Sequence, residues 1–195
     1  LPSIVGGTSM LIYKIVQTLI ILLFAFFVSD LRKKNQTKKL LNQTLLVSMK
    51  VIYLIPLLIF LFSVFRSNTF LVSDFLSLLF TLVGLAIVMV AKISLGTYHS
   101  WTGFGTYPKA FLSKGIYSKI RHPMYTGIFT CIIGMWFHVF WHASLFLVIT
   151  NFCCSLFIFY VLISSSHKEE EHLLLLFGND YQQYLNQVHP FLPIK

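Results

Sequence analysis

Two polar stretches late in the chain carry the side chains best suited to chemistry. The first is GIYSKIRHPMYTG, residues 115–127, in which Arg121, His122 and Pro123 directly precede a long apolar run. Proline is favoured in the first turn of a helix, because its missing N–H would be unpaired there anyway. The amides of that turn and the helix dipole favour an anion. Arg121 and His122 therefore stand where a carboxylate or phosphate would bind.

Two tyrosines, Tyr117 and Tyr125, flank this motif and could cover an aromatic or sulfonium group. A structural interpretation explains the same residues equally well. Arg121 would then be a topology anchor, His122 a helix cap, and the tyrosines part of an interfacial aromatic belt. The residue types alone leave both interpretations open.

The second stretch is KEEEHLLLLFGNDYQQYLNQVHPFLP, residues 168–193, whose three consecutive glutamates are half of the six acidic residues. We expect them to begin a helix, where negative charge is stabilised. The functional alternative is that one or two of them accept hydrogen bonds from sugar hydroxyls, as an acidic residue does in dinucleotide folds. Adjacent helical residues differ by about 100°, so Glu169 and Glu170 could share a pocket obliquely, whereas Glu171 should face elsewhere.

The rest of the chain is too apolar for a soluble domain. Of its 195 residues, 56% are hydrophobic and 11% charged, with a mean hydropathy of +0.78, whereas soluble domains carry about 25% charged residues. A helix needs about 20 predominantly apolar residues to span a bilayer. The sequence predicts an all-α integral membrane protein with about five transmembrane helices. The candidate spans are residues 10–29, 44–65, 70–91, 124–141 and 144–164.

We expect a single membrane domain over residues 1–195. Three N-terminal transmembrane helices occupy residues 10–91, and residues 92–195 hold a cofactor-binding loop, a helical hairpin (124–164) and a C-terminal tail. The tail carries apolar and aromatic residues at helical spacing, so the loop and tail together could roof a pocket. These spaced residues are Leu173, Phe177, Tyr181 and Tyr184.

Basic residues indicate the orientation. The formal net charge is +9, and the basic residues gather in the loops after the first and third spans, which predicts that both loops face the cytoplasm. The amino terminus would then lie outside, and the tail and candidate site would be cytoplasmic. This distribution suits contact with membrane lipids and disfavours nucleic acid. The basic residues concerned are Arg32, Lys33, Lys34, Lys38, Lys39, Lys92, Lys109, Lys114, Lys119 and Arg121.

Ionisable and metal-binding residues elsewhere give weaker signals. The seven histidines offer no convincing i, i+4 ligand pair in the polar segments, so no metal is expected, and Cys131, Cys153 and Cys154 read as packing residues. Lys14 is expected to snorkel to the interface. Lys50 and Asp74 fall within or near apolar spans, where a functional role is also open.

The RHP motif followed by the pattern EExxLxxxFGxxYxxY resembles the isoprenylcysteine carboxyl methyltransferase family and its phospholipid methyltransferase relatives, as a short member of the prokaryotic type. The likeness extends over roughly residues 95–193 and does not include the first three spans. The matching residues are Leu95, Gly96, Gly115, Tyr117, Arg121, His122, Pro123, Tyr125, Gly127, Glu169, Glu170, Leu173, Phe177, Gly178, Tyr181, Tyr184 and Pro193.

The resemblance implies an S-adenosylmethionine-dependent methyltransferase that releases S-adenosylhomocysteine. Its cofactor would lie between the loop before the fourth span and the tail after the fifth, and its acceptor would be a lipophilic or lipidated molecule such as a prenylcysteine carboxylate. The implied catalytic residues are Glu170 and Arg121. The implied cofactor-binding residues are Lys109, Ala110, Phe111, Leu112, Gly115, Tyr117, His122, Pro123, Met124, Tyr125 and Glu169.

One residue departs from the family pattern. Relatives that act on prenylated cysteine usually carry an arginine four residues before the first glutamate, where it holds the substrate carboxylate, but this chain has Ser165. Either Lys168 or Arg121 supplies that charge, or the acceptor is not a prenylcysteine carboxylate. A carboxylate acceptor needs no general base, whereas an amine or phenol would need one, for which Glu170 and His122 are the candidates.

Two rival functions would use some of the same residues. An NADPH-dependent membrane reductase of the sterol type shares an RHP-like motif, but a 2′-phosphate would prefer arginine where Glu169 to Glu171 stand. A non-enzymatic transporter or scaffold would instead use Lys50 and Asp74 as a charge-relay pair. Stabilisation by S-adenosylhomocysteine would favour the methyltransferase.

Overall fold

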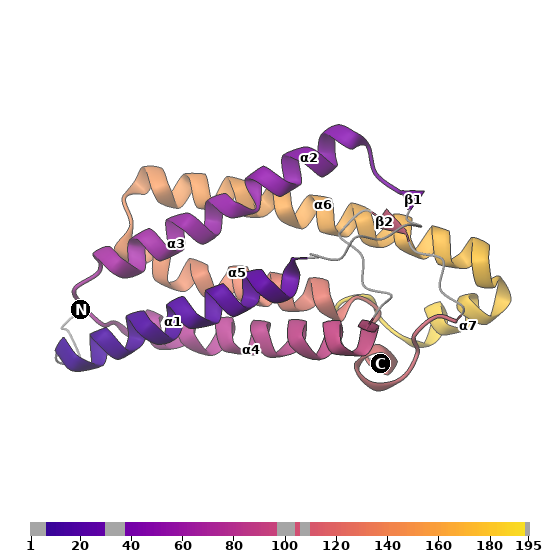
Figure 1. Cartoon of the computed structure of the whole chain (residues 1–195), viewed down its shortest axis with the longest axis horizontal. Helices are drawn as coiled ribbons and strands as arrows, with labels where there is room; N and C mark the ends of the chain where they lie inside the picture. The colour runs from indigo at the N-terminus through magenta and orange to yellow at the C-terminus, as the bar shows by residue number, and fades with distance from the viewer. Residues whose placement is uncertain (1–6, 30–37, 97–103, 106–109, 194–195) are drawn as a thin grey trace.

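The computed structural model describes residues 7–29, 38–96, 104–105 and 110–193. Long helices run roughly along one axis (Figure 1), which confirms the all-α prediction. Two short strands, β1 (Lys38–Lys39) and β2 (Phe104–Gly105), form an antiparallel pair. The helices are α1 (Gly7–Val28), α2 (Gln43–Ile52), α3 (Leu54–Arg66), α4 (Val72–Leu95), α5 (Pro123–His142), α6 (Leu145–Phe177) and α7 (Asn179–Gln187), with a 3-10 helix η2 (Gly115–Ser118) before α5.

Five stretches of the described chain are long and apolar enough to cross a membrane, as predicted. α2 and α3 together form the second of them. Large apolar side chains such as Leu58, Phe62 and Phe65 point outward and are more than half exposed. Lipid tails are as apolar as these side chains, so a bilayer satisfies a surface that water would not. The protein is a multi-pass membrane protein.

The second span is broken at Tyr53, where the prediction had one uninterrupted helix. Pro56 lies in the first turn of α3, and a proline ring clashes with the carbonyl four residues earlier and offers no N–H. The amide of Tyr53 still donates to the Met49 carbonyl at 2.9 Å. The chain therefore continues in nearly the same direction, with a local break between α2 and α3.

The fifth span differs more from the prediction, because α6 continues for 33 residues through Glu169 to Glu171. No proline or glycine interrupts it before Gly178, where a positive φ of 55° ends the helix. A helix of this length measures about 50 Å, well beyond a hydrocarbon core of about 30 Å. The expectation that the glutamates begin a helix is wrong, and stabilisation of a helix start does not explain them.

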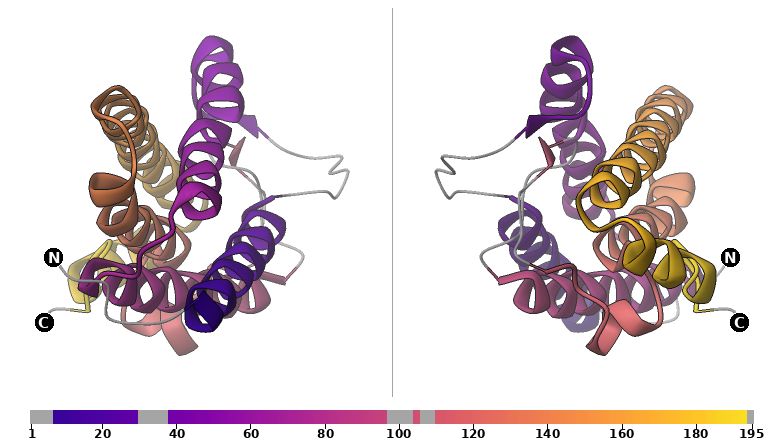
Figure 2. Two further views of the ribbon diagram at one scale, coloured as in Figure 1. Left: turned by 90° about the vertical axis from the view of Figure 1, so that its left-hand side faces the viewer. Right: turned by 90° about the vertical axis from the view of Figure 1, so that its right-hand side faces the viewer.

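The central helix α5 contacts α3, α4 and α6. In the end-on views of Figure 2, α6 and the α2–α3 pair form two diverging arms, with α4 at their base. Glycines bring α4 and α5 close: a Cβ at Gly84 would lie 2.7 Å from the Gly127 carbonyl, and one at Gly127 would lie 2.8 Å from the Gly84 carbonyl. Small residues permit this backbone approach between membrane helices.

The two ends of the bundle differ in what they hold. One end, called the site end, contains the start of α5, the last turns of α6, and α7; the other, called the far end, contains the α3–α4 and α5–α6 connections (Figure 1). Pairing of β1 with β2 joins the segments that follow α1 and α4, and the described parts of both segments lie at the site end.

Candidate functional site

At the site end, the residues before α5 meet the extension of α6. Nε of Arg121 and Nε2 of His122 each lie 2.9 Å from the same oxygen, Oε1 of Glu170. The Tyr125 hydroxyl donates to Glu169 Oε1, and His122 Nδ1 lies 3.8 Å from Glu169 Oε2. These five residues, the site cluster, thus bring both glutamates to the RHP motif.

The start of α5 fixes the aromatic side of the cluster. Pro123 is the first helical residue, as predicted, and His122 is the N-cap. His122 and Tyr125 lie three residues apart and therefore on one helix face, where their rings stack with centroids 5.6 Å apart and planes inclined by 7°. The two adjacent glutamates of α6 contact different rings: Glu170 contacts the imidazole of His122, and Glu169 contacts the phenol of Tyr125.

Arg121 is held inside the protein instead of reaching toward lipid headgroups. Its Nη1 donates to the carbonyls of Leu185 and Val188 at 2.6 and 2.7 Å, and its side chain is 12% exposed. The backbone N–H of Arg121 donates to the His189 carbonyl at 2.9 Å. A topology anchor would need none of these contacts, so they favour a role for the guanidinium within the site.

The tail beyond α7 covers the start of α5. The His122 N–H donates to the Pro190 carbonyl at 2.9 Å, and the Thr126 hydroxyl donates to the Phe191 carbonyl at 2.9 Å. The Phe191 ring also packs against His122, with centroids 5.9 Å apart. The tail thereby holds the RHP motif through backbone carbonyls.

Aromatic side chains from α7 and from the loop before α5 lie over this region, and we call them the aromatic roof. The Phe111 ring packs against Tyr181 and Tyr184, with centroids 5.2 and 5.5 Å away. Burial raises the pKa of Tyr184 to about 12. Its hydroxyl therefore stays protonated at neutral pH and donates to the Tyr117 carbonyl at 2.6 Å. Burial, and secondarily the charge of Glu169, also raises the pKa of Tyr117.

The predicted site residues differ in where the structure places them. Arg121, His122, Tyr125, Glu169 and Glu170 form the site cluster, and Phe111 and Tyr117 join it through α7 and the tail. Pro123 and Met124 are buried in the first turn of α5. Ala110, Leu112 and Gly115 lie on the described loop before α5 and form no hydrogen bond or ion pair with the cluster. Lys109 lies outside the described residues.

One expectation about a neighbouring residue is confirmed. Glu171 faces away from the cluster, as helical spacing predicts: its side chain is 62% exposed and pairs with Lys168 at 2.7 Å. In the tail, Tyr181 and Tyr184 are both buried and pack against Phe111 of the loop before α5; the pocket that loop and tail could roof stays a prediction.

Several contacts of the cluster were not anticipated from the sequence. The carbonyls of Leu185, Val188, His189 and Pro190 hold Arg121 and His122, but every residue has a carbonyl, so residue type carries no signal for them. Pro190 and Pro193 predict only that regular structure stops there. Carbonyls released at the end of a helix need other donors.

Comparison with known families gives an independent result. The phospholipid methyltransferase family model matches residues 72–180. The match begins with α4, contains the whole site cluster and leaves out α1 to α3. No curated protein matches the chain. Because the family model covers more than half of the 195 residues and contains both halves of the cluster, the chain belongs to the phospholipid methyltransferase family.

Proposed function

We propose that this protein transfers a methyl group from S-adenosylmethionine to a lipophilic acceptor, and that the site cluster is the reaction centre. The observation that carries the proposal is the convergence of Arg121 and His122 with Glu169 and Glu170 at one end of a membrane bundle. Family membership favours methyl transfer over an NADPH-dependent reduction. The basic residues that follow α1 and α4 in the sequence support a cytoplasmic position for this end.

The donor set fits a zwitterionic sulfonium cofactor. Such a molecule presents an ammonium, a carboxylate, a sulfonium and ribose hydroxyls, and supplies a methyl group bonded to positively charged sulfur. Glu169 keeps 24% of its side chain exposed and would accept from the ammonium or the hydroxyls. The stacked rings of His122 and Tyr125 offer aromatic faces to the positive charge.

Glu170 and His122 form a dyad that suits proton removal. Glu170 receives hydrogen bonds from Arg121 and His122, and these stabilise its charged form. With the His122 proton on Nε2, facing Glu170, the lone pair lies on Nδ1, on the side of Glu169. A carboxylate that orients a histidine base in this way is a recurrent catalytic arrangement. We infer that His122 receives the proton and that Glu170 positions it.

The neighbourhood of Ser165 bears on the acceptor. Ser165 is fully buried, and its hydroxyl has no hydrogen-bond partner among the described residues. Lys168 pairs with Glu171 on the outer face, and Arg121 is held by Glu170 and two carbonyls. Neither cation is placed to take over a substrate carboxylate. We therefore propose an amine acceptor, such as an aminophospholipid, in preference to a prenylcysteine carboxylate.

Methyl transfer from labelled S-adenosylmethionine to phosphatidylethanolamine vesicles tests the acceptor, with a small prenylcysteine as the competing acceptor. We expect label in the aminolipid. Label in the prenylcysteine alone would retain the methyltransferase and overturn the amine acceptor. Labelling of neither acceptor, together with no thermal shift in saturating S-adenosylhomocysteine, would overturn the proposed function.

Glu169→Gln tests the cofactor site, with Glu171→Gln as the matched control because Glu171 is the same residue type two positions away and faces outward. Loss of a hydrogen bond to a charged group should weaken S-adenosylhomocysteine binding roughly tenfold to a hundredfold. The control should bind like the wild type. Equal affinities in all three proteins would place the cofactor elsewhere.

A further inference from the structure

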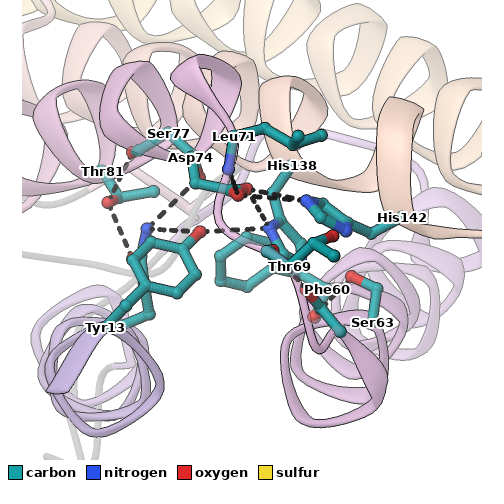
Figure 3. A network of polar contacts seen from close by, with 12 residues as sticks. Tyr13, Phe60, Ser63, Thr69, Leu71, Asp74, Ser77, Thr81, His138 and His142 are labelled. Carbon is teal, nitrogen blue, oxygen red and sulfur yellow. Dashed lines mark hydrogen bonds and ion pairs between the residues drawn. The ribbon is translucent and has the colours of Figure 1, made fainter. Parts of the chain in front are cut away.

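A second polar cluster lies in the far end of the bundle, where the proposed reaction does not use it. Asp74 from the first turn of α4 meets two histidines near the end of α5, His138 and His142 (Figure 3). Asp74 and His138 have no exposed side-chain surface, and His142 has 6%. We refer to these three residues as the far cluster.

The distances within the far cluster are hydrogen-bond distances, slightly shorter than those between the ligands of a small cation. Oδ1 of Asp74 lies 2.7 Å from Nδ1 of His138 and 3.0 Å from Nε2 of His142. One ligand atom from each residue can be chosen so that all three lie within 4.8 Å of one another. In a tetrahedral zinc site with bonds of about 2.0–2.2 Å, ligand atoms lie about 3.3–3.6 Å apart. A small adjustment of side-chain torsions would reach that geometry.

The local structure explains why these residues meet. His138 and His142 are separated by one helical turn, so both imidazoles emerge on the same face of α5. Their rings stack with centroids 4.3 Å apart. Asp74 is held toward them because its other oxygen, Oδ2, accepts from the Leu71 N–H at 2.7 Å. The histidine pair was not predicted as ligands because it lies in an apolar run, outside the polar segments.

A layer of further polar residues supports the far cluster. The Tyr13 hydroxyl of α1 lies 3.1 Å from His138 Nδ1, and Gln17 donates to Ser77 at 3.2 Å and accepts from Thr81 at 3.0 Å. Ordered outer partners of this kind orient metal ligands. The layer also links α1 to α4 and α5, the two helices that supply the ligands.

The charges and burial make a structural interpretation without a cation incomplete. A carboxylate removed from water at this depth is costly unless it is compensated. Among the described residues, its partners are the imidazoles of His138 and His142 and the Leu71 N–H, and no lysine or arginine neutralises it. Lys50, which a transporter would use with Asp74 as a charge-relay pair, is exposed on α2 and forms no ion pair with it.

We propose that Asp74, His138 and His142 bind one divalent transition-metal ion, and that zinc suits this donor set best. Two imidazoles and one carboxylate match the ligands of zinc, whereas magnesium and calcium prefer oxygen ligands throughout. His142 is the last residue of α5, so the ion would approach from the membrane face opposite the site cluster. The ion would join α4 to α5. Because about 30 Å of α5 separates the two clusters, the ion would lie too far from the site cluster to act in the proposed reaction, and its role would be structural.

The test measures metal in purified full-length protein carrying a purification tag without histidines. After equilibration with zinc and removal of excess ion, elemental analysis should find about one zinc per chain. His142→Gln should reduce this content at least about tenfold. His167→Gln is the matched control, because His167 is a surface histidine of α6 and its removal should leave the content unchanged.

Folding of each variant is checked separately by its affinity for S-adenosylhomocysteine, which the far cluster does not contact. Zinc, but not magnesium, should raise the melting temperature of the wild type, and this increase should vanish in His142→Gln. A wild type that retains no zinc, or a His142→Gln protein that retains as much as the wild type, would overturn the proposal. Equal losses in His142→Gln and His167→Gln would indicate surface binding and would also overturn it.

Discussion

The two polar clusters use similar residue types and sit at opposite ends of α5, yet they are built differently. The site cluster combines a helix start, a helix extension and the backbone of the tail, and Glu169 keeps 24% of its side chain exposed. The far cluster comes from helices alone, and Asp74 and His138 are fully buried. Helices packed side by side give rigid, dry positions, whereas loops and helix ends admit water and ligands.

This difference separates two roles for a carboxylate beside a histidine. At the site end, Glu170 also contacts Arg121, so the charge of Glu170 is neutralised within the protein, and the neighbouring Glu169 is partly exposed. At the far end, Asp74 has imidazoles and a backbone amide as partners, and no lysine or arginine pairs with it among the described residues. The first arrangement suits turnover and the second suits a fixed link between helices.

The largest effect should come from a residue on which both clusters depend. Gly84→Leu would force α4 away from α5, because a Cβ alone would lie 2.7 Å from the Gly127 carbonyl. We expect a loss of well over 3 kcal/mol of stability and loss of both ligand-induced thermal shifts. Ala86→Leu, on the exposed side of α4, is the control. A folded Gly84→Leu protein with both shifts intact would contradict the glycine contact.

Asp74→Asn should separate the clusters by stability. The substitution keeps the shape but removes the charge that accepts from His138, His142 and the Leu71 amide. We expect a loss of about 2–4 kcal/mol in zinc-containing buffer, because the ion loses its anionic ligand; the loss is measured by unfolding in mixed micelles. S-adenosylhomocysteine affinity should stay unchanged. If Asp74→Asn weakened S-adenosylhomocysteine binding without any loss of stability, the roles assigned to the two clusters would be wrong.

Arg121→Lys should give the opposite pattern. An ammonium cannot reproduce the planar fork by which Arg121 contacts Glu170, Leu185 and Val188. Methyl transfer should fall roughly a hundredfold, which corresponds to about 2.7 kcal/mol, while the melting temperature changes little. Lys119→Ala, which removes an exposed basic residue nearby, should leave the rate unchanged. Full activity of Arg121→Lys would instead support the interpretation of Arg121 as a topology anchor.

The smallest effect is expected in the aromatic roof. Tyr184→Phe removes the hydrogen bond to the Tyr117 carbonyl and should cost about 1 kcal/mol. Above about pH 10 an unfolded tyrosine loses its proton, whereas folded Tyr184 keeps it until about pH 12. The wild type should therefore lose stability relative to the variant between these pH values. A difference that is constant up to pH 12 would mean that the hydroxyl is not buried.

Hydropathy predicted the number of spans. The two motifs were expected to meet because the segments after the third and fifth spans lie on the same side of the membrane. The prediction missed the length of α6, since the end of an apolar run was taken as the end of a helix. Nothing between Ser164 and Phe177 breaks a helix, so the correct signal was the first glycine, Gly178. The local break at Tyr53 had a signal of its own in Pro56.

Contacts made by backbone atoms or by apolar runs were the least predictable. The carbonyls that hold Arg121 have no sequence signature. The pairing of Asp74 with His138 and His142 depends on the register between α4 and α5, which close glycine contacts set. Hydropathy indicates that these helices cross the membrane, but not which faces of them meet.

The uninterrupted course of α6 makes the position of Glu169 and Glu170 depend on the tilt of the whole helix. Glu169 lies about 36 Å along a rigid rod from Leu145, so a change in tilt of about 10° in a thinner or thicker membrane would swing its carboxylate by about 6 Å relative to the bundle. Lipid chain length would thereby tune how closely the glutamates approach the start of α5, with no ligand or covalent modification involved.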